Sequence, residues 1–114
     1  FDGGEDELLG RARIAVRDAL LHGAPTAASL ARTLGLGQRT LQRRLAELGT
    51  SYAELLESTR RVLAEGYLHD RTLGLAEIAY LLGYDEQTSF FRAFRRWHGQ
   101  APGAYRRGLG LTGQ

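Results

Sequence analysis

The chain has 114 residues, enough for one domain or for two very small ones that share a core. Hydrophobic residues make up 43% of it and occur along almost its whole length, which excludes a disordered chain. The sequence has no cysteine, which argues against disulfides, a thiolate zinc site and an oxidising compartment. No apolar run approaches the roughly 20 residues that span a bilayer, and no signal peptide is visible, so we expect a cytoplasmic protein without a membrane contact.

Charge is distributed unevenly along the sequence. The formal net charge is +2, but four of the 13 acids lie within residues 1–7. From Leu8 onward the chain has 15 arginines and 9 acids, and it has no lysine at all. Arginine carries a planar fork of donors that pairs with phosphate or with guanine. We interpret residues 1–7 as the remnant of a flexible linker. Because the sequence starts at Phe1 and contains no Met, we expect it to be a piece of a longer protein.

Hydrophobic periodicity and the positions of Gly and Pro predict an all-α fold of about seven helices. The expected ranges are about 5–22, 27–34, 38–48, 51–69, 75–82, 86–98 and a last short turn from Pro102 through Tyr105. One face of the first helix is apolar and holds Leu8, Ala12, Ala15, Val16, Ala19 and Leu20. Thr26 and Asp85 are expected N-caps, and Ser51 with Glu54 fits a capping box. Residues 108–114 are expected to form a flexible tail.

Two segments of the chain repeat one pattern. Leu30-Ala31, Leu34 and Gly35 recur 48 residues later as Ile78-Ala79, Leu82 and Gly83. After the turn, Leu41, Arg43 and Leu45 recur 49 residues later as Phe90, Arg92 and Phe94. The second copy therefore has one extra residue at the entry to its last helix. Each copy reads as a helix, a short Gly-containing turn and a helix, which is the helix-turn-helix pattern. We predict one domain over 8–107, with units at about 8–50 and 70–107 joined by a linker helix at 51–69.

The helix expected at 38–48 is apolar on one side and polar on the other. Its core face consists of Leu41, Leu45 and Leu48. The opposite face holds two pairs spaced four apart, Gln38 with Gln42 and Arg39 with Arg43. Arginine can bind guanine O6 and N7, and glutamine can bind adenine N6 and N7, so these four side chains are candidates for reading bases in the major groove. Arg44 lies to the side, where we predict a phosphate contact.

The helix expected at 86–98 repeats this design. Its core stripe consists of Phe90, Phe94 and Trp97, and its outer face holds Gln87, Thr88, Phe91 and Arg92. We predict base reading by Gln87, Thr88 and Arg92, and phosphate contacts by Arg95 and Arg96. Two alternatives remain for Phe91: an exposed aromatic that packs against a thymine methyl, or a ring that is partly buried.

The expected helix at 51–69 would separate the two polar helices. At about 1.5 Å per residue it would be about 28 Å long. Such a spacer could hold two recognition helices about one DNA turn apart, near 34 Å, so that both enter successive major grooves of one duplex. A single chain could then do what a helix-turn-helix dimer does.

Two stretches closely resemble the DNA-binding domain of AraC/XylS-type transcription regulators. They are SLARTLGLGQRTLQRRLAELGTSYAELL at 29–56 and LAEIAYLLGYDEQTSFFRAFRRWHGQAPGAYRR at 75–107. The resemblance covers about residues 10–107 and is most specific at Ile78-Ala79, Gly83-Tyr84, Phe90, Arg92, Phe94, Gly99, Pro102, Tyr105 and Arg106. It implies seven helices, with two helix-turn-helix units joined by a long helix.

The resemblance also implies a function and partners. It implies binding to double-stranded DNA at bacterial promoters, usually as an activator, and contact with RNA polymerase. It implies a separate N-terminal domain that binds an effector or dimerises in the full-length protein. The base-reading positions of the family fall on Gln38, Arg39, Gln42, Arg43, Gln87, Thr88 and Arg92. The sequence departs from the family at Gly37 and Gly74, where a Ser helix cap is common, and at Phe91, where a small polar residue is common.

An enzyme and a protein-interaction module are the alternatives. His22, His69 and His98 lie far apart without metal-ligand spacing, and neither a phosphate-binding Gly loop with Lys nor a nucleophile elbow is present. We therefore predict no catalytic residue, cofactor or metal. An interaction module without sequence-specific DNA binding would dock through apolar residues of the long helix: Tyr52, Leu55, Leu56, Val62 and Leu63. Salt separates the two readings, because phosphate binding weakens steeply as salt rises and apolar docking does not.

Overall fold

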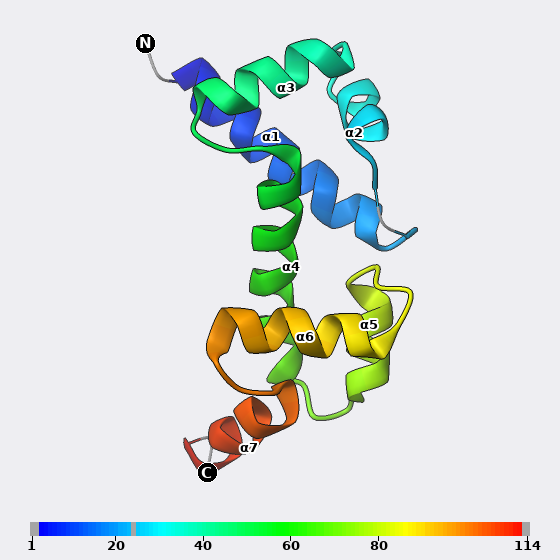
Figure 1. Cartoon of the computed structure of the whole chain (residues 1–114), viewed down its shortest axis with the longest axis vertical. Coiled ribbons are helices and arrows are strands. Elements are labelled where there is room, and N and C mark those ends of the chain that lie inside the picture. Colours follow the sequence, from blue (N-terminus) through cyan, green and yellow to red (C-terminus); the bar gives the residue numbers. More distant parts are fainter. Residues whose placement is uncertain (1–2, 24, 113–114) are drawn as a thin grey trace. The chain divides into compact units, whose positions relative to one another are not determined.

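The computed structural model describes residues 3–23 and 25–112, with side chains described for 7–23 and 25–109. Seven helices follow one another in this part of the chain (Figure 1): α1 (Gly3–Leu20), α2 (Ala27–Thr33), α3 (Gln38–Glu47), α4 (Tyr52–Leu68), α5 (Leu75–Leu81), α6 (Gln87–His98) and α7 (Pro102–Thr112). No β-strand occurs among these residues, and the predicted all-α fold is confirmed. None of the seven helices is both long enough and apolar enough to cross a membrane.

The chain divides into two compact units, Phe1–Arg60 and Arg61–Gln114, and the division falls within α4. The core of the first unit is aliphatic and is drawn from four helices and the turn after α2. Its buried members are Leu8, Ala12, Val16, Leu20, Leu30, Ala31, Leu34, Leu41, Leu45 and Leu55. On α1 these residues recur every four positions, so that one stripe of the helix faces the core as predicted. Ala15 and Ala19, beside that stripe, are half-buried.

Polar side chains fix where α2 and α4 begin. The Thr26 hydroxyl accepts the backbone N–H of Ser29 at 3.0 Å, and the Ser29 hydroxyl accepts that of Thr26 at 2.9 Å. This reciprocal capping box confirms Thr26 as an N-cap. At α4, the Ser51 hydroxyl accepts the Glu54 N–H at 3.2 Å, but the Glu54 carboxylate receives a bond from the Ser51 hydroxyl rather than from its backbone. The predicted capping box is therefore only half formed.

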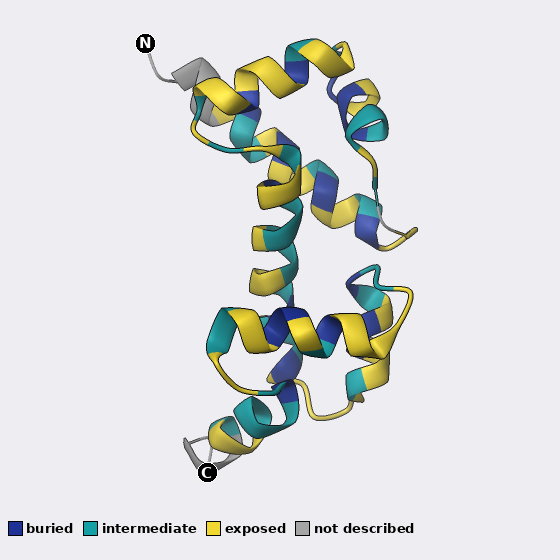
Figure 2. Cartoon of the chain, in the orientation of Figure 1, coloured by how far each residue is buried: buried dark blue, intermediate teal, exposed yellow. Residues whose placement is uncertain are grey.

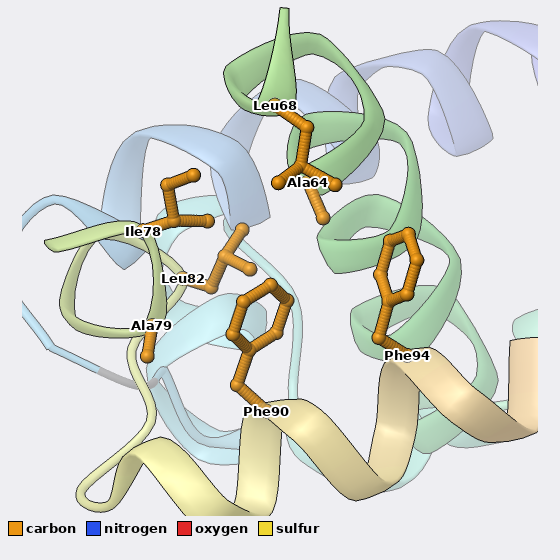
Figure 3. Packing of buried hydrophobic residues seen from close by; sticks show 7 residues of the cluster. All are labelled: Ala64, Leu68, Ile78, Ala79, Leu82, Phe90 and Phe94. Atoms are coloured by element: carbon orange, nitrogen blue, oxygen red, sulfur yellow. The ribbon is translucent and has the colours of Figure 1, made fainter. Parts of the chain in front are cut away.

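The second unit has its own core, in which aromatic rings replace several leucines (Figure 3). Phe90 and Phe94 of α6 lie one turn apart, with ring centroids 5.9 Å apart in an edge-to-face arrangement. They are fully buried, together with residues from α4, α5 and the turn after α5: Ala64, Leu68, Ile78, Ala79 and Leu82. Trp97, the third member of the predicted stripe, is half-buried at the margin of this core, with its ring centroid 6.0 Å from that of Phe94.

The turns between paired helices begin in the same way in the two units. Gly35 and Gly83 have φ of 72° and 81°, a left-handed conformation that glycine adopts without strain. The residue after each glycine donates its N–H to the carbonyl five positions back: Leu36 to Ala31 at 2.9 Å, and Tyr84 to Ala79 at 3.1 Å. Each glycine N–H also bonds three positions back, which completes the Schellman motif that ends a helix.

The predicted N-cap at Asp85 is wrong by one residue. Glu86 occupies the cap position of α6, with φ −132° and ψ 142°, and its side chain forms no capping bond. In the first unit the corresponding position is Gly37, two residues after Gly35, whereas Glu86 follows Gly83 by three residues. The extra residue of the second copy is thus accommodated between the glycine and the cap, where the backbone is not yet helical.

Helix α1 is as long as expected but begins and ends two residues earlier, whereas α7 is longer than the sequence indicates. Helix α1 already begins at Gly3, and α7 continues to Thr112. The expected linker remnant at 1–7 and tail at 108–114 are therefore helical over 3–7 and 108–112. For α7 the cause is packing, because Tyr105 and Leu109 are one turn apart and both lie against the core of the second unit.

Candidate nucleic-acid interface

Helix α3 has the two contrasting faces that its sequence predicts. Leu41 and Leu45 are completely buried, while Leu48, at its C-cap, is half-buried. The four predicted base-reading side chains are all exposed: Gln38, Arg39, Gln42 and Arg43. Figure 2 shows this contrast as alternating buried and exposed segments along the ribbon of α3. Since the leucines fix the rotation of the helix about its axis, the face with Gln and Arg is held toward solvent.

Arg43 has a partner within its own helix. Its Nε lies 3.9 Å from a carboxylate oxygen of Glu47, one turn further along α3. Both side chains are about two-thirds exposed, at 66% and 62%, so water screens the pair and its contribution to stability is small. The pair therefore leaves Arg43 able to bind elsewhere. Arg44 is also exposed, but it is rotated about 100° around the helix from Arg43.

Helix α6 has the same organisation. Phe90, Ala93 and Phe94 are buried, and the predicted base-reading residues Gln87, Thr88 and Arg92 are exposed. Arg95 and Arg96, the predicted phosphate contacts, are exposed as well. The structure thus brings the site residues together within each helix as two separate faces, one on α3 and one on α6.

Phe91 lies between the core and the outer face of α6. It is half-buried and packs on the core of the second unit, with its ring centroid 5.9 Å from that of Phe90. The ring is therefore partly buried rather than fully exposed. Phe91 also lines a pocket of about 230 Å³, together with Thr88, Arg92, Arg95 and Ala101. Sequence reasoning missed this pocket because Ala101 comes from the segment between α6 and α7.

His98, at the end of α6, contacts two aromatic rings and a carboxylate. The His98 ring stacks on Phe94, with centroids 4.4 Å apart, and lies 4.8 Å from Tyr105 of α7. Its Nε2 is 2.7 Å from a carboxylate oxygen of Glu65, although the contact lacks the alignment of a hydrogen bond. Arg61 donates a bond of 3.2 Å to the same oxygen. His98 thus links α6 to α4 and α7 in the second unit. In the described residues, no three His, Asp or Glu side chains gather as a metal site.

Arg106 has a structural role that the sequence did not reveal, although the residue is part of the family resemblance. Its guanidinium donates to four backbone carbonyls around the end of α4. The acceptors are those of Leu68 at 3.1 Å, Leu73 at 2.7 Å, Asp70 at 3.2 Å and Tyr67 at 3.5 Å. The last carbonyls of a helix have no partner within it and carry partial negative charge, so the fork of a half-buried arginine is well matched to them. Arg106 thus anchors α7 to the end of α4 within the second unit.

Comparison with known proteins identifies the fold. A helix-turn-helix domain family matches residues 30–108, which run from the second half of α2 into α7. The chain belongs to this helix-turn-helix family. The ornithine utilization regulator of Pseudomonas aeruginosa is 44% identical to it over 82 residues, which are 72% of this chain and 24% of the relative. The transcriptional regulator VirS of Mycobacterium tuberculosis is 43% identical over 98 residues, 86% of this chain and 29% of the relative.

Solved structures of DNA-binding transcription regulators also superimpose on this chain. A DNA-binding transcriptional dual regulator from Escherichia coli superimposes with a TM-score of 0.84 at 25% identity, covering 89% of this chain and 90% of that one. The DNA-binding domain of AdpA, solved with a target DNA, superimposes with a TM-score of 0.78 at 25% identity, covering 91% of this chain and 94% of that one. The predicted AraC/XylS-type resemblance and the predicted class of function, a DNA-binding domain of a transcription regulator, are confirmed. This helix-turn-helix chain spans about a quarter of the length of the curated relatives.

Proposed function

We propose that α3 and α6 are both recognition helices, and that they read bases in successive major grooves of a bacterial promoter. The observation that carries the proposal is the repeated contrast between a buried apolar stripe and an exposed face of Gln, Arg and Thr on the second helix of each pair. A helix-turn-helix protein inserts this second helix into the major groove. A face kept only for solubility would have no reason to recur at equivalent positions of a repeat.

The side chains divide into two roles. Gln38, Arg39, Gln42 and Arg43 of α3, with Gln87, Thr88 and Arg92 of α6, are proposed to contact base edges, where amide and guanidinium groups distinguish A·T from G·C. Arg44, Arg95 and Arg96 are proposed to contact phosphates, which position the protein on the duplex without reading sequence.

The properties of the full-length regulator are also proposals, because the chain spans about a quarter of the length of its relatives. We propose that the DNA-binding domain comprises 8–107 and belongs to a longer cytoplasmic protein with an effector-binding or dimerising domain. Its contact with RNA polymerase would activate transcription. The regulators among its relatives support a role in DNA binding rather than catalysis.

Selection of bound sequences from a pool of random duplexes tests the proposal. Two enriched blocks about 10 base pairs apart are expected, one for each recognition helix. The affinity of the winning duplex should fall steeply with salt, and a shuffled duplex of equal length serves as the control for non-specific binding. A single enriched block would show that only one helix reads sequence. No enrichment together with flat salt dependence would instead support an interaction module.

A further inference from the structure

The pocket on α6 follows the outer face of the helix. Thr88, Phe91, Arg92 and Arg95 are spaced at i, i+3, i+4 and i+7, which places all four on one stripe, and Ala101 closes the pocket from the segment before α7. Three of the four are exposed and Phe91 is half-buried. Thr88 and Arg92 belong to the proposed base-reading set. DNA that sits on α6 therefore covers this pocket.

The lining of the pocket combines apolar and cationic groups. Phe91 and Ala101 are apolar and Thr88 carries a methyl group, while the arginines on the same stripe are cationic. Cationic walls attract the phosphates that flank a groove. An apolar floor between them has one natural partner in the major groove, because the C5 methyl group of thymine is the apolar group that base pairs present there.

We propose that this pocket receives the C5 methyl group and the adjacent ring edge of a thymine, and that Phe91 makes the second unit prefer thymine at one position. The proposal rests on the proposed role of α6 as a recognition helix. Because Arg92 lines the same pocket, the thymine lies beside the base pair that Arg92 contacts. The core contact of Phe91 with Phe90 holds the aromatic ring in place before DNA arrives, so its ordering adds no entropic cost on binding.

Replacing single thymines by 2′-deoxyuridine removes the methyl group and leaves every hydrogen-bonding group in place. The selected duplex is therefore remade with one such change at each thymine, and the dissociation constants are compared. The expected result is that one thymine of the second block loses about four- to ten-fold in affinity, the effect of losing one buried apolar group of methyl size. A second block without a thymine, or one in which every replacement leaves the affinity unchanged, would overturn the proposal. A phosphate in the pocket would produce the second of these results.

Variants at Phe91 then assign the effect to the pocket. In Phe91→Ala the affinity ratio between thymine and deoxyuridine duplexes should fall to about one, whereas Phe91→Leu, which keeps an apolar floor, should retain a ratio above one. Thymines of the first block provide the internal control, since their ratios should not respond to either change. An unchanged ratio at the second block in Phe91→Ala would overturn the assignment. If that variant does not fold, as seen by circular dichroism, Thr88→Ser removes an exposed methyl group from the same pocket and should lower the ratio.

The outcomes separate this inference from the proposed function. Selection that yields no specific site would contradict the role of α3 and α6 as readers. A specific site with two blocks but no methyl-sensitive thymine in the second would leave the readers intact and refute only the role of the pocket.

Discussion

Arg106 Nη1 donates a hydrogen bond of 2.7 Å to the carbonyl oxygen of Leu73, 33 residues earlier in the chain. The same guanidinium also donates hydrogen bonds to carbonyls at and just after the end of α4. One side chain therefore joins α7, α4 and the segment before α5. Arg106→Ala would remove this donor from the carbonyls of Leu68 and Leu73, whose bonds are partly buried, whereas the carbonyl of Asp70 keeps the N–H of Leu73. We expect a loss of about 2–4 kcal/mol in the free energy of unfolding, because bonds to a charged group are stronger than neutral ones.

Chemical denaturation followed by circular dichroism measures this loss. Arg107→Ala is the matched control, since it removes the same charge from the next, exposed position of α7, and it should change stability by less than about 0.5 kcal/mol. Arg106→Lys keeps the charge but not the fork and should fall between the two. Equal stability of the Arg106→Ala and Arg107→Ala variants would show that the carbonyl contacts contribute nothing measurable.

The turn before α3 contains two glycines whose backbone conformations differ: one is open to any residue and the other favours glycine. Gly37 has φ −71° and ψ 150°, a conformation open to any residue, and a Cβ there would meet nothing within 4 Å. Gly37→Ser would supply the missing N-cap hydroxyl and reduce the freedom of the unfolded chain, a gain of about 0.5–1 kcal/mol. Gly35 has equal space but φ of +72°, so Gly35→Ser should lose about 1–2 kcal/mol. Thermal unfolding of both variants gives the comparison, and a stabilising effect of Gly35→Ser would contradict the left-handed turn.

Asp70 should make the free energy of unfolding of the second unit depend on pH in the acidic range. The Thr72 hydroxyl and backbone N–H donate to its Oδ1 at 2.6 and 3.0 Å, and these bonds, aided by Arg106, hold the pKa of Asp70 below its ordinary value of 3.8. A carboxylate with a lowered pKa in the folded state stabilises the protein above its unfolded pKa, and that contribution disappears as pH falls through the folded pKa. Asp70→Asn keeps an acceptor oxygen and removes only the charge.

Denaturation of both proteins at a series of pH values tests the sign of this effect. The wild-type protein should be the more stable one at neutral pH. Its advantage should shrink as pH falls below 3.8 and vanish at still lower pH. An advantage that grew toward acid would show that the charge of Asp70 opposes folding.

The faces of the helices were predictable from sequence, whereas the contacts that join distant segments were not. Leu41, Leu45, Phe90 and Phe94 lie at helical spacing, and burial of that stripe settles which side chains remain outside. The partners of Arg106 are backbone carbonyls, and a carbonyl has no signature in a sequence. Ala101 reaches the α6 pocket only because the chain turns back after Gly99, whose φ is 73°.

Local ambiguity accounts for the remaining errors. Asp85 and Glu86 are both acidic residues before the same helix, and the position of the extra residue in the turn decides which of them is the cap. The glycines near the end of the chain are typical of a tail, but packing of Leu109 beside Tyr105 outweighs their low helix propensity.

Neighbouring arginines on α3 offer the sharpest test of the two proposed roles. Arg43 lies on the proposed base-reading face and Arg44 lies about 100° away around the helix, yet both are exposed and carry the same charge. Arg43→Ala should cost about 1–3 kcal/mol on the selected duplex and relax the choice of base at one position, because it removes a contact to a base edge. Arg44→Ala should weaken binding to all duplexes alike and lower the salt slope by about one.

Each variant is the control for the other, and binding of selected, single-mismatch and shuffled duplexes at several salt concentrations distinguishes them. The second unit offers the equivalent comparison of Arg92→Ala with Arg96→Ala. Loss of the Arg43 pair with Glu47 does not confound the result, because an exposed pair 3.9 Å apart contributes little to stability. Uniform weakening by Arg43→Ala, or a base-selective loss from Arg44→Ala, would reverse the roles proposed for the two side chains. Both outcomes would mean that α3 enters the groove with a different rotation about its axis from the one that its buried leucines indicate.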